Sequence, residues 1–243
     1  MNPFSFEEYK VIVEKIQSYL PLMGYKEALN KDKFFILRHD VEFSVERAYD
    51  LALFEKENGI FSNYFFQIRN NCYNLFSSKN ILLIQNIKKM GHNIGLHAHM
   101  GFLDNIKNID KYIIGDCDVM SKLTGIKIDS FSFHRPKKEY LALNLKIKGI
   151  INAYQDKYFT FTGNIKNREI FYTSDSNHQW KWGSPLNKNL SKYNKIQLLI
   201  HPYSWTKKGY NNENNFSSLL MEKDIELRKS INEEIVTFPK TLL

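Results

Sequence analysis

The stretch FFILRHDVE, residues 34–42, joins an apolar run directly to a run of charged residues. The apolar half, Phe34–Leu37, has the length and composition of a buried β-strand. The charged half follows at the point where that strand should end. In proteins built from parallel strands, ligands bind at the carboxyl ends of the strands. This stretch therefore predicts an α/β fold with a site that begins at residue 38.

The same alternation of short apolar runs and helical segments continues along the chain. Further strands are expected at 61–67, 92–97, 128–133, 149–154, 169–174 and 196–200, with helices at 5–20, 44–58, 75–90, 106–123 and 219–235. The first strands recur at intervals of about 30 residues, the repeat of parallel βαβ units. Such strands form either an open sheet or a barrel. Ser5 and Ser44 are expected to cap the first two helices, and Asn211–Asn215 is expected to be a polar loop.

Composition excludes several classes of protein. The chain has 243 residues, 43% of them hydrophobic, which suits a single domain over 1–243. No apolar run approaches the roughly 20 residues of a membrane span. The net charge is +8, but the lysines are scattered and no nucleic-acid motif accompanies them, so no nucleic-acid partner is expected. The acidic start, MNPFSFEE, is unlike a signal peptide, which predicts a cytoplasmic protein.

Ionisable residues gather where strands are expected to end. Five such segments contain His, Asp, Glu or Arg: 38–42, 95–99, 133–136, 174–176 and 200–205. Of the seven histidines, only His92 and His178 lie elsewhere. Each residue alone has an ordinary explanation, because an Asp after a strand is often a helix cap. The joint pattern instead predicts one site.

The residue types in these segments suit metal-assisted hydrolysis. Neutral imidazoles and a carboxylate bind Zn²⁺, Co²⁺, Ni²⁺ or Fe²⁺ and leave room for water. Such a metal lowers the pKa of water and polarises a carbonyl group. A carboxylate can remove the proton of the water, and a histidine can protonate the leaving group. An arginine can hold the carboxylate or bind a charged part of the substrate.

The order of these motifs resembles the NodB-homology polysaccharide deacetylase superfamily. The similar segments are 38–42, 91–97, 134–136, 172–175 followed by Trp180, and 199–201, and together they span about residues 34–205. The resemblance implies a distorted, incomplete (β/α) barrel of about seven parallel strands. It also implies removal of N- or O-acetyl groups from sugars with a divalent metal, for which zinc is the first expectation and cobalt, nickel or iron would also suit.

The resemblance also assigns roles to residues. The histidine expected four residues after His97 is replaced by Gly101, so His99 or His134 must take its place. His134 is preferred because it too follows a strand. The sequence does not decide which of Asp40 and Glu42 contacts the metal. The assigned metal ligands are Asp40, His97 and His134; the catalytic residues are Glu42 as base, His201 as acid, and Arg135 paired with Asp175; the substrate contacts are His99, Trp180, Tyr203 and Trp205.

The expected function is removal of an acyl group, first of all N-acetyl, from a sugar or an activated sugar precursor. Because no export signal is present, a small-molecule or lipid-linked acylated sugar is expected as substrate. The form of the 38–42 motif is similar to that of members from bacterial clusters for O-antigen or capsule synthesis. Gly101 motivates the alternative, a carbohydrate-binding relative that has lost turnover. A basic nucleic-acid binder is a third, disfavoured hypothesis.

Overall fold

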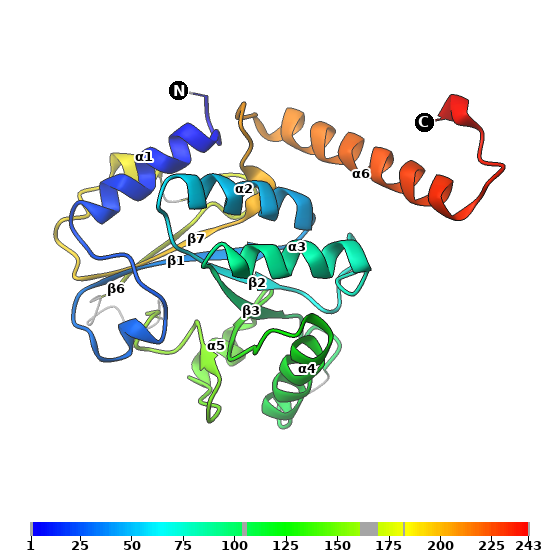
Figure 1. Cartoon of the computed structure of the whole chain (residues 1–243). Coiled ribbons are helices and arrows are strands. Elements are labelled where there is room, and N and C mark those ends of the chain that lie inside the picture. The colour runs from blue at the N-terminus through cyan, green and yellow to red at the C-terminus, as the bar shows by residue number, and fades with distance from the viewer. Residues whose placement is uncertain (1, 104–105, 161–169, 182, 243) are drawn as a thin grey trace.

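Seven parallel strands form one curled sheet (Figure 1). The computed structural model describes residues 2–103, 106–160, 170–181 and 183–242. Within these ranges the strand order is β5-β4-β3-β2-β1-β7-β6, and β5 and β6 are edges that do not pair with each other. The expected incomplete barrel is therefore confirmed. The strands are β1 (Phe34–Val41), β2 (Asn63–Phe66), β3 (Asn93–Ala98), β4 (Ser130–Phe133), β5 (Ile151–Asn152), β6 (Ile170–Ser174) and β7 (Lys195–Ile200).

The helices begin largely where the sequence predicts. The side chain of Ser5 accepts a hydrogen bond from the backbone N–H of Glu8, and that of Ser44 accepts one from Arg47, so both predicted caps are present. No described helix is long and apolar enough to cross a membrane. The helices are α1 (Phe6–Gln17), α2 (Val45–Glu57), α3 (Ser78–Lys89), α4 (Ile109–Thr124), α5 (Lys138–Ala142) and α6 (Asn212–Glu234), with 3₁₀ turns at Glu27–Asn30, Pro185–Asn187, Pro202–Ser204 and Lys240–Leu242.

The start of α6 differs from the prediction. The polar loop expected at Asn211–Asn215 is wrong, because Asn211 caps the helix and the next residues form its first turn. The side chain of Asn211 accepts a hydrogen bond from the N–H of Asn214, which is the ordinary role of asparagine at an N-cap. The helix then extends away from the sheet (Figure 1). Its early start brings Asn212 to the carboxyl ends of the strands.

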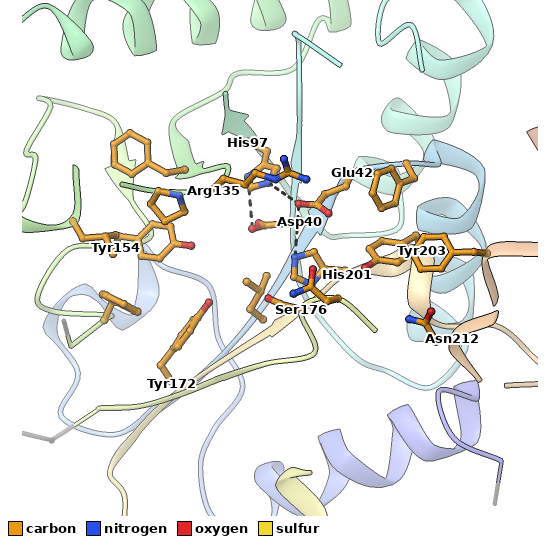
Figure 2. A pocket seen from close by; sticks show the side chains of 18 residues that line it. Asp40, Glu42, His97, Arg135, Tyr154, Tyr172, Ser176, His201, Tyr203 and Asn212 are labelled. Atoms are coloured by element: carbon orange, nitrogen blue, oxygen red, sulfur yellow. Dashed lines mark ion pairs between the residues drawn. The ribbon is translucent and has the colours of Figure 1, made fainter. Parts of the chain in front are cut away.

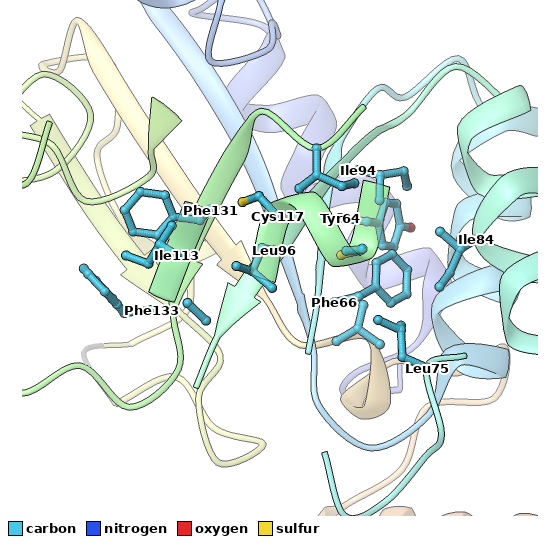
Figure 3. Packing of buried hydrophobic residues seen from close by; sticks show 14 of the residues in the cluster. Tyr64, Phe66, Leu75, Ile84, Ile94, Leu96, Ile113, Cys117, Phe131 and Phe133 are labelled. Carbon is cyan, nitrogen blue, oxygen red and sulfur yellow. The ribbon is translucent and has the colours of Figure 1, made fainter. Parts of the chain in front are cut away.

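The outer face of the sheet is covered by helices. One apolar cluster joins β2, β3 and β4 to α2, α3 and α4. Figure 3 shows part of it, with Ile113 and Cys117 of α4 over Leu96 and Phe131. A second cluster packs α1 against β1 and β7. This burial fixes the strands, and hence their ends, in a rigid frame.

Strand β1 is buried on both faces, and its side chains alternate between them. Phe35 and Leu37 join the cluster under α1. Phe34 and Ile36 belong to a separate cluster on the inner face. The same alternation places Arg38 with Asp40 on the inner face, where the apolar lining gives way to the polar groups of the strand end.

The side chain of His39, which points to the outer face of β1, contacts a buried carboxylate. Glu55 of α2 lies 2.7 Å from Nε2 of His39 and accepts hydrogen bonds from Ser62 (2.7 Å), Tyr64 (2.6 Å) and Tyr9. Burial raises the pKa of Glu55, but His39 and these donors outweigh it, so the pKa lies below its usual value. One ionised carboxylate thus holds α1, α2, β1 and β2 together.

We predict that Glu55→Gln lowers the free energy of unfolding by about 3–5 kcal/mol, the usual cost of breaking a buried, paired charge. Glu57→Gln is the matched control, because Glu57 is exposed on the same helix. Its effect should stay within about 0.5 kcal/mol. Urea denaturation of the three proteins checks this, and equal stabilities of the two variants would contradict the role given to Glu55.

Candidate active site

The carboxyl ends of the strands surround a cavity of about 550 Å³ (Figure 2). Asp40, Glu42, His97 and His201 face one another across it, with Tyr203 and Asn212 on one side and Tyr154 and Tyr172 on the other. The lining residues are Asp40, Glu42, Phe43, His97, Phe133, Arg135, Pro136, Leu141, Tyr154, Phe159, Tyr172, Ser176, Asn177, Leu199, His201, Tyr203, Asn212 and Phe216. The predicted convergence of strand ends therefore produces a pocket.

Glu42, His97 and His134 bring three potential ligand atoms together. The Oε1 atom of Glu42 lies 3.0 Å from Nδ1 of His134 and 3.8 Å from Nε2 of His97. The two histidine nitrogens are 3.2 Å apart. Among the described residues, these three side chains form the one group of His, Cys, Asp or Glu whose arrangement could hold a metal ion.

A hydrogen-bond chain orients His97. The Ser132 hydroxyl donates to Oδ1 of Asp40 (3.1 Å) and lies 2.8 Å from Nδ1 of His97. Because the single hydroxyl proton goes to Asp40, Ser132 accepts from Nδ1–H of His97. Burial lowers the pKa of His97, against the opposing effect of Asp40 and Glu42. The ring is therefore neutral, with its Nε2 lone pair directed to Glu42 and His134.

The cluster fits a divalent metal. Two imidazole nitrogens and one carboxylate oxygen are a common donor set for zinc and related ions. Tetrahedral bonds of about 2.0–2.2 Å place neighbouring ligand atoms about 3.3–3.6 Å apart, and the three separations of 3.0, 3.2 and 3.8 Å bracket this spacing. Burial raises the pKa of Glu42, but the facing side chains of His134, His97 and His201 outweigh it and lower the pKa. Glu42 is thus ionised, as a ligand must be.

Asp40 has a different set of partners. Arg38 donates to both of its carboxylate oxygens, from Nε at 2.9 Å and from Nη2 at 2.6 Å. The guanidinium is fully buried, lies 4.4 Å from the ring centre of Tyr154, and donates to the hydroxyl of that residue. Burial raises the pKa of Asp40, but Arg38 and His97 more than offset it and lower the pKa. Asp40 is therefore a fixed, ionised carboxylate beside the cluster.

The two carboxylates thus lie in positions opposite to those assigned from the sequence. Glu42 contacts the histidines, whereas Asp40 is held by Arg38 and Ser132. The reason lies in the strand. Asp40 is inside β1 and level with the buried arginine, while Glu42 follows the strand and extends into the cavity.

His201 is held from behind by Asp175. Its Nδ1 lies 2.7 Å from Oδ1 of Asp175, and the same oxygen accepts from the backbone N–H of His201. The other oxygen, Oδ2, accepts from Nε1 of Trp205 (2.6 Å). The opposite nitrogen, Nε2, lies 4.0 Å from Glu42. Burial lowers the pKa of His201, but Asp175, Glu42 and Asp40 raise it to about 9. His201 is therefore a proton donor at neutral pH.

Several residues predicted for the site lie outside it or have other contacts. Within the described part of the chain, no hydrogen bond or ion pair joins Arg135 to Asp175. Trp205 is buried behind Asp175, and Trp180 packs against Trp205 with ring centres 6.3 Å apart. Neither tryptophan lines the cavity. His99 stacks on His134 at 5.2 Å, whereas Tyr203 does border the cavity.

The structure adds residues that the sequence analysis missed. Arg38 was given no role from the sequence. It lies two residues before Asp40 on a strand, and residues two apart on a strand share a face. This spacing was the signal that could have predicted their contact. Phe43 and Phe216 flank Tyr203, with ring centres 4.7 and 5.7 Å from it. Phe216 belongs to α6, and no local pattern could show that this helix reaches the strand ends.

Comparisons with known proteins return structural similarity alone. No protein-family model and no curated sequence matches the chain. Among solved structures, it is similar to the CE4 domain of a multidomain xylanase from the hindgut metagenome of Trinervitermes trinervoides (14% identity, 82% of this chain and 85% of that one, TM-score 0.43). It is also similar to a chitin deacetylase from Colletotrichum lindemuthianum (15% identity, 78% of this chain and 81% of that one, TM-score 0.45). A third similar structure is a CE4 family pseudoenzyme from Bacillus anthracis (11% identity, 81% of this chain and 62% of that one, TM-score 0.42). Similarity at this level assigns neither a family nor an activity.

We predict that Glu42→Gln removes metal binding and that Asp40→Asn keeps it. Loss of a ligating carboxylate should weaken affinity at least about 100-fold, because even partners of metal ligands contribute about 10–100-fold. Each protein is incubated with zinc, desalted and analysed for metal content. About one zinc per chain is expected in the wild type and Asp40→Asn. Retention in Glu42→Gln with loss in Asp40→Asn would reverse the assignment.

Proposed function

We propose that this protein is a metal-dependent hydrolase that removes an acyl group, first of all acetyl, from a sugar. The observation that supports this most is the Glu42, His97 and His134 cluster at a cavity that also contains Asp40 and His201. A bound divalent cation would supply Lewis acidity at the acyl carbonyl and would make water more acidic. We further propose zinc as the ion, a cytoplasmic location, and an activated sugar precursor in surface-polysaccharide synthesis as the substrate.

The chain's own residues then supply the proton transfers. Asp40 is ionised and its orientation is fixed by Arg38, so it is the base that accepts a proton from the attacking water. His201 carries a proton that Asp175 stabilises, so it donates this proton to the departing amine or hydroxyl oxygen. The pair resembles other acid–base pairs whose opposite pKa shifts set their roles. Glu42 remains with the two histidines throughout.

The cavity walls suit a sugar. Phe43, Tyr203 and Phe216 form a connected aromatic wall beside His201, whose ring centre is 6.0 Å from that of Tyr203. Aromatic rings commonly pack against the apolar faces of ligands while polar groups fix their orientation. The wall lies on the side where the leaving group accepts its proton, which is the sugar side of the scissile bond. This placement supports the acylated-sugar substrate that the sequence motifs imply.

A carbohydrate-binding protein without turnover is the second candidate. Gly101 stands where the resemblance implies a metal histidine, and the first turn after β3 therefore supplies no ligand there. His134 fills the corresponding role in the cluster, which favours the enzyme. The binding candidate predicts sugar affinity without acetate release in the metal-loaded protein.

We predict that the zinc-, cobalt- or nickel-loaded protein releases acetate from N-acetylated sugars or sugar nucleotides. Removal of the metal by a chelator should abolish release, and return of the metal should restore it, because the carbonyl is then polarised again. Acetate is measured by an enzyme-coupled assay. Sugar binding with no acetate from a broad panel, in protein shown to contain metal, would select the binding candidate instead.

We also predict that His201→Ala lowers kcat by about 100- to 10,000-fold, the usual contribution of a general acid, without loss of metal. Metal content and thermal stability serve as controls for an intact site. A substrate with a good leaving group, such as a nitrophenyl acetate, needs little protonation and should be affected less. An equal loss on both substrates would contradict the acid role.

A further inference from the structure

Arg135 borders the candidate site, but its side chain is not needed to hold the other described residues of the site in place. It lies just beyond β4, is exposed, and borders the cavity (Figure 2). In the part of the chain that the structure describes, its guanidinium makes no ion pair or hydrogen bond. Asp40 is already held by Arg38, and Asp175 is already held by His201 and Trp205. The base therefore does not need Arg135.

The backbone at Arg135 is unusual. Its φ angle is +46°, in the left-handed region that residues other than glycine rarely occupy. Such a conformation costs free energy and occurs preferentially at functional sites. Here it accompanies a charged side chain at the cavity, and Pro136, which also lines the cavity, limits the backbone that follows.

Arg135 is the one lysine or arginine among the described residues that line the cavity, and none of them forms an ion pair with it. Of the lining carboxylates, Asp40 is paired with Arg38, whereas Glu42 contacts the two histidines of the cluster, where a divalent cation would balance its charge. Protonated His201 is paired with Asp175. With a divalent cation in the cluster, the charge around the cavity would be net positive.

We propose that Arg135 is a substrate-binding residue that recognises a negatively charged group on the acylated sugar. The planar guanidinium pairs with phosphate or carboxylate oxygens through two parallel N–H donors. The substrate class is therefore an anionic acyl sugar, whose charge comes from a phosphate ester or from a carboxylate. The inference rests on the proposed function, because it takes the ligand to be an acylated sugar.

The test compares charged and neutral sugars bound to the zinc-loaded protein. The probes are N-acetylglucosamine, N-acetylglucosamine 1-phosphate and N-acetylmuramic acid, with Kd measured by calorimetry. The wild type should bind at least one charged probe about tenfold or more tightly than the neutral one, in the range of a charged hydrogen-bonding pair. Which charged probe gains shows whether the anion is a phosphate or a carboxylate.

Arg135→Gln should remove this preference and leave the Kd of neutral N-acetylglucosamine unchanged. Arg135→Lys should retain part of it, because the charge remains while the paired donors are lost. Lys138→Gln is the matched control, with the same loss of charge three residues away on an exposed part of α5 outside the cavity. It should bind all probes as the wild type does.

Three results would overturn the proposal: equal affinity of the wild type for all probes, no binding of either charged probe at millimolar concentration, or the same loss in Lys138→Gln as in Arg135→Gln. A fall in kcat without a change in Kd would also overturn it, since Arg135 would then act on the base. Binding that depends on Arg135 in a protein that releases no acetate would instead contradict the proposed hydrolysis and leave this inference standing.

Discussion

The need to pair buried charge governs this structure. Strand β1 lies between β2 and β7 inside the sheet and is buried on both faces, yet it carries Arg38, His39 and Asp40 in succession. An unpaired charge in such a place is strongly destabilising. Outward, His39 contacts Glu55; inward, Arg38 and Asp40 form an ion pair. These two pairings connect the helical layer and the candidate site to the same strand, so Asp40 cannot move without disturbing the core.

The same constraint shapes the rest of the site. Asp175 is fully buried at the end of β6 and is satisfied by His201 and Trp205. Glu42, less deeply buried, is satisfied by His97 and His134. Each carboxylate thus has its own partners, and each pairing fixes the orientation of a side chain that the proposed reaction uses: Asp40, His201 and the Glu42 cluster. Chemistry and burial require the same contacts here.

The sequence predicted the positions of the strands and helices better than the contacts between the charged side chains of the site. Strand positions and helix caps follow from local patterns, because apolar runs of strand length and Ser at helix starts act over a few residues. His97, His134 and His201 could be placed at one edge of the sheet by the parallel-strand rule alone. Local patterns do not reveal which partner each charge finds. The alternation of β1 could have paired Arg38 with Asp40, but Arg135 was paired with Asp175 from the resemblance. The described part of the chain contains no hydrogen bond or ion pair between those two residues.

Contacts between distant parts of the chain account for the other differences between the predicted and the observed site. Trp180 and Trp205 were expected at the sugar, but aromatic side chains serve equally as core, and Trp205 is needed behind Asp175. The aromatic wall that does line the cavity includes Phe216, which α6 brings there. Arg47 of α2 holds this helix through Asn215 and Glu222. Such a contact spans more than 160 positions in sequence, beyond the reach of any periodicity.

The central claim is that Glu42, His97 and His134 together hold a divalent metal. A crystal structure of the cobalt-soaked protein, with anomalous differences recorded at the cobalt edge, tests it most directly. The account predicts one strong peak within about 2.0–2.3 Å of the Glu42 carboxylate and of the two imidazole nitrogens, with Asp40 still bound to Arg38. A peak bonded to Asp40 in place of Glu42, or no peak at the cluster at full cobalt loading, would contradict it.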